Sequence, residues 1–263
     1  MELNLGGRRA FVSGSTQGIG FAIARALLDE GVSVVVNGRS GEKVDDAVRR
    51  LKAPDADAAV TGIVADLGDE QQTAQLVQEL GAVDILVNNV GLFELASFND
   101  ISDDDWQRYF TLNVMSGVRL SRHALPSMLE RGWGRIVFIG SESGVNIPAD
   151  MVHYGVTKAA MLALSNGLAK LTHGTEVTVN TILGGPTYSD GVADTVAVLS
   201  QAQGIPADGL KRAIIGENRT SLLERFIEPE EIANLALYLA SPLSSATNGA
   251  ALRADGGVLT TIL

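Results

Sequence analysis

The sequence predicts an α/β fold, a doubly wound parallel sheet of about seven strands with helices on both faces. Short apolar runs alternate along the 263 residues with longer segments typical of helices. The apolar runs are mostly unbroken Val, Ile and Leu, as expected of strands that helices cover on both faces. We expect strands at 8–13, 32–37, 59–64, 83–88, 134–140, 176–182 and 249–253, and helices at 18–30, 41–52, 69–80, 103–131, 152–171 and 229–240.

The first predicted unit runs strand, glycine-rich turn, helix, strand. The turn is Ser13-Gly14-Ser15-Thr16-Gln17-Gly18-Ile19-Gly20. Glycines let a pyrophosphate approach the backbone, and the helix N-terminus offers free N–H groups and a partial positive charge. This unit predicts a Rossmann-type dinucleotide site, with the spacing Gly-x3-Gly-x-Gly in place of Gly-x-Gly-x-x-Gly. A tight turn that holds no ligand is the alternative.

The end of the second strand bears on the form of the cofactor. An acidic residue there binds the ribose 2′-hydroxyl of NAD, whereas an Arg accommodates a 2′-phosphate. The run is Val36-Asn37-Gly38-Arg39-Ser40, which has no acidic residue and places Arg39 where its planar guanidinium can pair with a phosphate. The sequence therefore favours NADP(H), while NAD(H) stays possible and Arg39 has the alternative of being a solvated surface charge.

Polar or small residues stand at the ends of four of the expected strands. Ser13, Asn88, Ser141 and Gly184 all come at carboxyl ends of strands. Ligands of open α/β sheets bind at this edge. We therefore expect these positions to line one site.

Tyr154 and Lys158 stand four residues apart at the start of the expected helix 152–171. This spacing puts a phenol and an ammonium group on the same helical face. A nearby cation lowers the pKa of a phenol, which can then exchange a proton with a substrate oxygen. His153 lies beside Tyr154, and we expect it to point away because neighbours on a helix diverge.

The segment from Gly184 to about Arg225 interrupts the alternation. About forty residues without a sheet strand are too many for an ordinary connection. Two short helical patches are expected within it, at about 190–203 and 206–216. No linker divides the chain elsewhere, so we expect one domain over residues 1–263 that carries this insertion.

Composition limits the classes of partner and compartment. A net charge of −11 disfavours nucleic acid and anionic membranes as partners. No apolar stretch is long enough to span a bilayer, and Met1-Glu2-Leu3-Asn4-Leu5 lacks the features of a signal peptide. The absence of Cys excludes thiolate metal sites and fits a reducing compartment. We expect a cytoplasmic protein without a metal.

Taken together, the glycine turn and the Tyr154–Lys158 pair resemble the short-chain dehydrogenase/reductase family, over nearly the whole chain. Within the family, the chain resembles the 3-oxoacyl reductase-like and glucose dehydrogenase-like members of about 250 residues. Further elements match in order: Asp66-Leu67, Asn88-Asn89-Val90-Gly91, Asn113, Ser141 thirteen residues before Tyr154, and Asp255-Gly256-Gly257. The family commonly has Pro-Gly where this chain has Gly184-Gly185, which predicts a looser backbone there.

The resemblance implies the roles of the site residues. The catalytic residues are Asn113, Ser141, Tyr154 and Lys158, with Tyr154 as the general acid/base, Ser141 as a second donor to the substrate oxygen, and Asn113 as the anchor of a water relay. The segment 184–225 becomes a substrate lid. The cofactor is then held by Gly14, Ser15, Thr16, Gln17, Gly18, Ile19, Gly20, Arg39, Ser40, Asp66, Leu67, Asn88, Val90, Gly91, Tyr154, Lys158, Gly185, Thr187 and Ser189.

We therefore expect an NADP(H)-dependent oxidoreductase that acts on a small carbonyl or alcohol substrate. The alternatives are a non-catalytic NADP-binding regulator, an NAD-dependent alcohol dehydrogenase, and an epimerase or dehydratase of the same fold. The resemblance implies a homotetramer that pairs the helices near 103–131 and 152–171, with a dimer as the second possibility. No residue combination in the sequence names the substrate.

Overall fold

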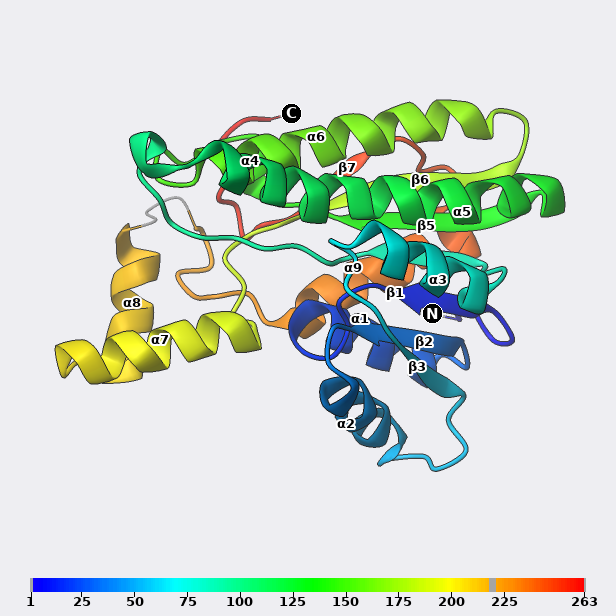
Figure 1. Cartoon of the computed structure of the whole chain (residues 1–263), viewed down its shortest axis with the longest axis horizontal. Coiled ribbons are helices and arrows are strands. Elements are labelled where there is room, and N and C mark those ends of the chain that lie inside the picture. Colours follow the sequence, from blue (N-terminus) through cyan, green and yellow to red (C-terminus); the bar gives the residue numbers. More distant parts are fainter. Residues whose placement is uncertain (1, 218–220, 263) are drawn as a thin grey trace.

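Seven runs rich in Val and Ile form parallel strands that join into one sheet. The computed structural model describes residues 2–217 and 221–262, and its sheet has the order β3-β2-β1-β4-β5-β6-β7 (Figure 1). The fold is thus the expected Rossmann-type doubly wound sheet. Its strands each begin and end within two residues of their expected bounds: β1 (Arg9–Val12), β2 (Ser33–Gly38), β3 (Val60–Val64), β4 (Ile85–Asn88), β5 (Trp133–Ile139), β6 (Glu176–Gly184) and β7 (Ala251–Ala254).

Alternate residues of β1, β2, β4 and β5 enter two separate cores. Ala10 and Val12 of β1 pack on one face of the sheet, and Phe11 packs on the other. The first face is covered by α1 (Gly18–Asp29), α2 (Gly41–Lys52) and α9 (Pro229–Ala240). The second is covered by α3 (Glu70–Leu80), α5 (Ser116–Arg131) and α6 (Val152–Ala169). Burial on both faces explains why the strands carry unbroken apolar runs.

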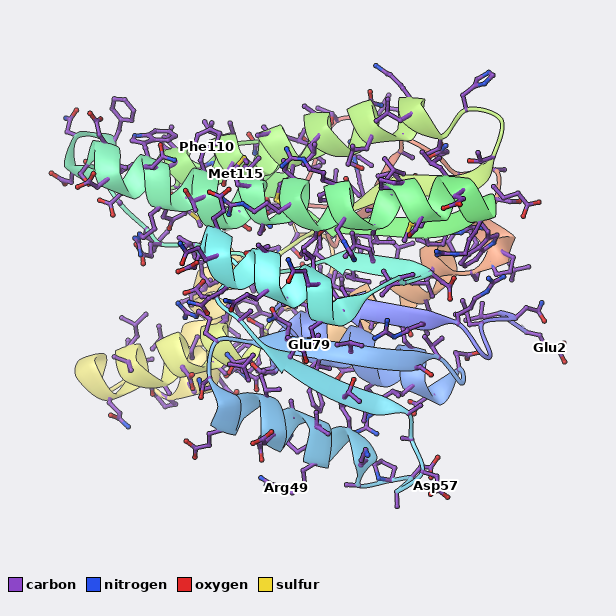
Figure 2. All side chains as sticks on the ribbon, turned by 45° about the vertical axis from the view of Figure 1, so that its right-hand side comes forward. Glu2, Arg49, Asp57, Glu79, Phe110 and Met115 are labelled. Atoms are coloured by element: carbon purple, nitrogen blue, oxygen red, sulfur yellow. The ribbon has the colours of Figure 1, made fainter. Side chains whose placement is uncertain are left out.

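The prediction of one continuous helix over 103–131 is wrong, because a π-helical segment interrupts it. The structure has α4 (Asp103–Tyr109), then a π-helical segment (Phe110–Met115), then α5. Figure 2 labels Phe110 and Met115, the two ends of this segment. Asn113 lies inside it and makes the side-chain contacts described below, which hold the widened turn. Short π-helical segments often mark functional sites.

The segment after β6 leaves the sheet as expected. It contains α7 (Asp190–Gln203) and α8 (Ala207–Glu217), close to the two expected helical patches. Figure 1 shows both helices at the left, beyond the main body of the sheet. Val196, Leu210 and Ile215 are buried, whereas Val198 and Ile205 are exposed.

None of the helices in the described part of the chain combines the length and the apolar character that spanning a bilayer requires.

Candidate active site

The glycine turn is held against the end of β4 by the hydroxyl of Ser13. The Ser13 Oγ accepts the backbone N–H groups of Asn89 (2.9 Å) and Val90 (3.0 Å). Gly14 has φ +60°, and a Cβ there would lie 3.1 Å from the Val90 Cα. A Cβ on Gly20 would lie 2.5 Å from the Asn89 side chain and from the Gly14 carbonyl oxygen. The turn therefore requires glycine at these two positions, as a cradle of exposed backbone does.

Ser15 does not face a ligand with its side chain. It is fully buried, its Oγ donates to the Val12 carbonyl (2.6 Å), and it accepts the Asn37 N–H (3.0 Å). Asn37 in turn donates to the Ile63 carbonyl oxygen. The side chains of Ser15 and Asn37 thus fix the turn to β2 and β3. The Ser15 N–H also donates to the Asn37 carbonyl (2.9 Å), so both hydrogen-bond donors of Ser15 are engaged within the protein. The sequence analysis assigned no role to Asn37, although Asn is frequent where backbone groups need hydrogen-bond partners.

The N-terminus of α1 already carries an anion. Its N-cap residue Gln17 makes no side-chain cap, and the Gly18 N–H donates to the Asp190 Oδ2 at 2.5 Å. Asp190 belongs to the first turn of α7, and the Ser189 side chain also lies against Gly18. A carboxylate on the Gly18 N–H shows that the start of α1 accepts an anionic oxygen, which is the kind of atom a pyrophosphate would place there. The residues present therefore fit a dinucleotide.

Arg39 stands free beside this turn. Its side chain is exposed, and it has no hydrogen bond or ion pair to any residue that the structure describes. Ser40 is the N-cap of α2. A Cβ on Gly38 would lie 2.6 Å from the Thr16 Cγ2, so an acidic side chain at Gly38 would collide with the turn as it stands.

Asp66 and Leu67 follow β3, and the Asp66 side chain is partly exposed whereas the Leu67 side chain is buried. The Asp66 Oδ1 accepts the Gly68 N–H at 2.8 Å, and this carboxylate is partly exposed. Leu67 is a core residue, so only its backbone is open to a ligand.

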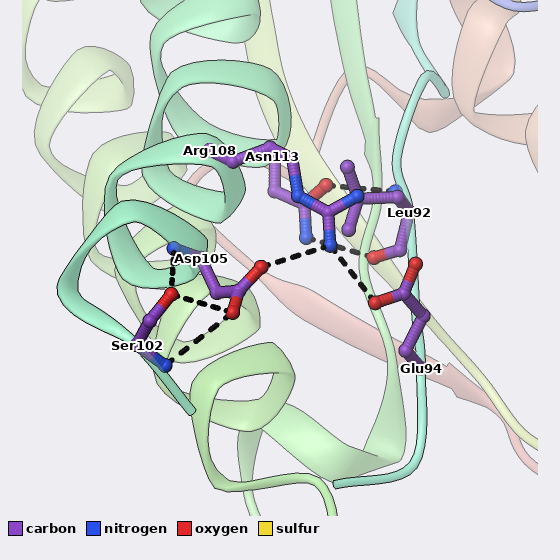
Figure 3. A network of polar contacts seen from close by, with 6 residues as sticks. All are labelled: Leu92, Glu94, Ser102, Asp105, Arg108 and Asn113. Atoms are coloured by element: carbon purple, nitrogen blue, oxygen red, sulfur yellow. Dashed lines mark hydrogen bonds and ion pairs between the residues drawn. The ribbon is translucent and has the colours of Figure 1, made fainter. Parts of the chain in front are cut away.

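Asn113 joins the π-helical segment to the chain that follows β4. Its Oδ1 accepts the Leu92 N–H (2.8 Å), and its Nδ2 donates to the Leu92 carbonyl (3.1 Å) and to the Thr157 Oγ1 (3.0 Å). Figure 3 shows the Asn113–Leu92 pair beside the exposed contacts of Arg108. A Cβ on Gly91 would lie 3.4 Å from the Asn113 Oδ1 and 3.6 Å from the Lys158 Nζ. Gly91, Asn113 and Lys158 therefore meet at one point.

Asn88 and Val90 lie at the same sheet edge. Asn88 is buried, and its Nδ2 donates to the Ser121 Oγ at 3.3 Å. Val90 packs against Gly14. Both residues shape the floor between the glycine turn and the π-helical segment.

Ser141, Tyr154 and Lys158 complete the cluster. Ser141 follows β5, and its Oγ donates to the Glu142 Oε2 at 3.2 Å. The Lys158 Nζ donates to the Ile139 carbonyl at 2.9 Å and lies 5.6 Å from the centre of the Tyr154 ring. His153 points away from Tyr154, as expected, because it packs on the ring of Tyr109 at 4.0 Å.

The pKa values of this cluster are set by burial. Burial lowers the pKa of Lys158 to about 8. It also raises the pKa of Tyr154 to about 12, against an opposing interaction with Ser141. In this arrangement the Lys158 ammonium group is directed at a backbone carbonyl, and burial is the main influence on the pKa of Tyr154, so a lowering of that pKa by Lys158 stays a prediction.

The loop after β6 is well held. Gly185 packs directly on the backbone of Asp255, where a Cβ would lie 2.5 Å from the carbonyl oxygen. Gly184 is paired with Ala254 in the sheet, so the looser backbone expected from the missing Pro is not found. Thr187 donates through its Oγ1 to the Gly185 carbonyl, and its backbone pairs with Ile227. Ser189 is the N-cap of α7.

Comparison with known proteins gives a consistent result. Residues 8–198 match the family described as short chain dehydrogenase. The chain is 46% identical to the uncharacterized oxidoreductase YvaG of Bacillus subtilis, with full coverage of both chains. It is 32% identical to D-beta-hydroxybutyrate dehydrogenase of Cupriavidus necator, over 96% of this chain and 98% of that one. The crystal structure of L-sorbose reductase from Gluconobacter frateurii, complexed with NADPH and L-sorbose, superposes with a TM-score of 0.94 at 31% identity and covers both chains fully.

Proposed function

Since the chain belongs to the short-chain dehydrogenase/reductase family and is an oxidoreductase of that class, we propose that it is an NADPH-dependent reductase of small carbonyl compounds with Tyr154 as general acid. The observation that carries this proposal is the meeting of Ser141, Tyr154, Lys158 and Asn113 at the edge where the strands end. Tyr154 and Lys158 come from α6, Asn113 from the π-helical segment and Ser141 from the end of β5, and the glycine turn lies at the same edge.

The protonation states suit reduction. With a pKa near 12, the Tyr154 hydroxyl keeps its proton at neutral pH and can donate it to the oxygen of a carbonyl. Ser141 is a second hydroxyl in contact with the same space, able to stabilise developing negative charge on that oxygen. When bound, NADPH supplies the hydride.

Lys158 suits the resupply of protons. Its pKa near 8 lies close to neutral pH, where a group both gives and takes protons readily. Asn113 and Thr157 hold the backbone around it. Solvent would restore the proton of Tyr154 by way of this ammonium group.

Preference for NADPH over NADH is supported by Arg39 and Gly38. At Gly38 the turn leaves no room for the acidic side chain that would bind the ribose 2′-hydroxyl of NADH. The Arg39 guanidinium is exposed and has no partner among the described residues, so it is available to a 2′-phosphate. The bound NADPH of L-sorbose reductase, a protein similar over its whole length, points the same way.

We propose that the segment 184–225, with α7 and α8, acts as the substrate lid of a single-domain enzyme. The support is that α7 starts at Asp190, whose carboxylate contacts the N-terminus of α1. Tyr188 lies between Phe226 and the Lys211 ammonium group, which joins the base of α7 to α8. Closure of such a segment would exclude water from the reaction.

Assembly into a homotetramer through α5 and α6 is supported by the outer face of α6. Val156, Ala160, Ala163 and Gly167 recur at helical spacing and are partly or fully exposed. A face of small side chains lets another helix approach closely. Light scattering on the purified protein distinguishes a tetramer from a dimer.

The test of the proposed function begins with fluorescence titration by NADPH and NADH. We expect Arg39→Ala to weaken NADPH by about 10- to 100-fold, as for loss of a charge-assisted phosphate contact, with little effect on NADH. Arg49→Ala, which removes an arginine whose side chain is 74% exposed on α2 (Figure 2), is the matched control. Equal effects on both cofactors would instead support an NAD-dependent enzyme.

Turnover is then measured at the nicotinamide absorbance with a panel of ketones, keto esters, acetoacetyl thioesters and sugars. Oxidation of NADPH by a carbonyl supports the reductase. Tight binding of NADPH without turnover of any carbonyl or alcohol would support a non-catalytic regulator.

A further inference from the structure

Glu142 places a carboxylate within the catalytic cluster. It follows Ser141 directly, in the short 3-10 helix Glu142–Gly144 after β5. Its Oε2 lies 3.2 Å from the Ser141 Oγ, and its charge acts on the Tyr154 phenol, whose pKa it raises. The carboxylate therefore faces the same space as the two hydroxyls that meet the substrate oxygen.

Among the residues that the structure describes, no Lys, Arg or His forms an ion pair with this carboxylate. Burial raises its pKa first, Asp255 raises it further, and only the Ser143 and Ser141 side chains oppose the rise. The groups that act on it thus include no Lys, Arg or His. A partly buried carboxylate in this position gains most from a neutral hydrogen-bond donor.

The Ser141 hydroxyl has a single proton to donate. In the structure it points to Glu142, while the Ser141 Oγ accepts the Ser143 N–H at 3.1 Å. A hydroxyl that donates one hydrogen bond cannot give the same proton to a substrate carbonyl. Ser141 becomes free for the carbonyl when another donor satisfies Glu142.

We propose that Glu142 is a specificity-determining residue whose carboxylate accepts a hydrogen bond from a substrate hydroxyl next to the reacting carbonyl. The inference rests on the carbonyl reductase function proposed above. The preferred substrates are then neutral α-hydroxy ketones, which reduction converts into vicinal diols. With a simple ketone the Ser141 hydroxyl stays hydrogen-bonded to Glu142. A keto acid adds a third carboxylate beside those of Glu142 and Asp255.

Three ketones of nearly equal size test this assignment: hydroxyacetone, 2-butanone and pyruvate. All three contain an acetyl group. The group bonded to its carbonyl carbon is CH2OH in hydroxyacetone, CH2CH3 in 2-butanone and a carboxylate in pyruvate. We expect the wild-type kcat/KM to favour hydroxyacetone over 2-butanone by about 10- to 100-fold, as for loss of a hydrogen bond to a charged group. Pyruvate should be the poorest of the three.

Two variants separate the charge of Glu142 from its size. Glu142→Ala should bring the ratio of hydroxyacetone to 2-butanone close to one, and Glu142→Gln should lower the ratio and improve pyruvate. Glu79→Gln makes the same change on the exposed face of α3 (Figure 2) and should leave the ratio at its wild-type value. NADPH titration of each variant checks that the cofactor site is intact.

The outcomes are distinct. A wild-type enzyme that prefers pyruvate or 2-butanone overturns the proposal without any variant, and so does a ratio that both Glu142 variants leave unchanged. Failure of the wild type to reduce any of these ketones or the wider panel would refute the reductase function itself, and this proposal with it.

Discussion

Replacing Asn113 by Ala removes three hydrogen bonds from the interior of the protein. The Asn113 side chain is 1% exposed and links the π-helical segment to both backbone groups of Leu92 and to the Thr157 hydroxyl. Each net hydrogen bond contributes about 1 kcal/mol, and leaving a buried group without a partner costs about 1–3 kcal/mol. We therefore expect Asn113→Ala to lower the free energy of unfolding by about 3–4 kcal/mol, a large share of the 5–15 kcal/mol typical of a domain.

Urea unfolding at constant pH measures this loss, with an unchanged m-value showing that the midpoint reports stability. Thr157→Val removes one of the three bonds and also the Thr157 bond to the Tyr154 carbonyl, so it should cost about 1–2 kcal/mol. Arg108→Ala removes the exposed ion pairs with Glu94 and Asp105 (Figure 3) and should cost less than about 1 kcal/mol. A loss for Asn113→Ala no larger than that for Arg108→Ala would refute the reasoning.

Three further predictions concern the cluster and the lid. Tyr154→Phe should lower kcat by about 10²- to 10⁴-fold, as for loss of a general acid, and leave the Kd of NADPH nearly unchanged. Because the pKa of Lys158 falls from 10.5 to about 8 on folding, the unfolded state binds more protons between these values, and stability should rise with pH across this window in the wild type but not in Lys158→Met. Asp190→Asn should tighten NADPH about 2- to 5-fold in fluorescence titration, since the carboxylate that occupies the α1 N-terminus contributes about 0.3–1 kcal/mol there.

Each of these three predictions has an outcome that would contradict it. Retained turnover in Tyr154→Phe would exclude it as the proton donor. Parallel stability curves for wild type and Lys158→Met between pH 8 and 10 would show that the ammonium group is not desolvated. Weaker NADPH binding by Asp190→Asn would mean that the carboxylate supports the cofactor site and does not compete for it.

Much of the fold was predictable because its signals are local. Unbroken apolar runs identified the strands, and the glycine spacing identified the turn, since both follow from the backbone and from burial on two faces. The positions of Tyr154 and Lys158 on one face followed from the helical period alone.

The features that the sequence did not predict depend on contacts between distant segments. Asp190 meets Gly18 across 172 positions, and Asn113 meets Leu92 across 21. The direction of the Lys158 ammonium group depends on a carbonyl at Ile139, and the direction of Glu142 on the path of the chain after β5. No periodicity or composition records such pairings.

The π-helical segment also makes the length of the chain between α4 and α5 significant. A π turn takes up more residues than an α turn, so it shifts the angular phase of everything that follows. With this phase, Tyr109, just before the segment, contacts His153, while Leu120 and Ala124, after the segment, face the sheet. Deleting a single residue between Phe110 and Met115 would restore a regular helix and turn one of these two faces toward water. Insertions and deletions should therefore be tolerated far less here than in an ordinary surface helix, although the segment contains no unusual amino acid.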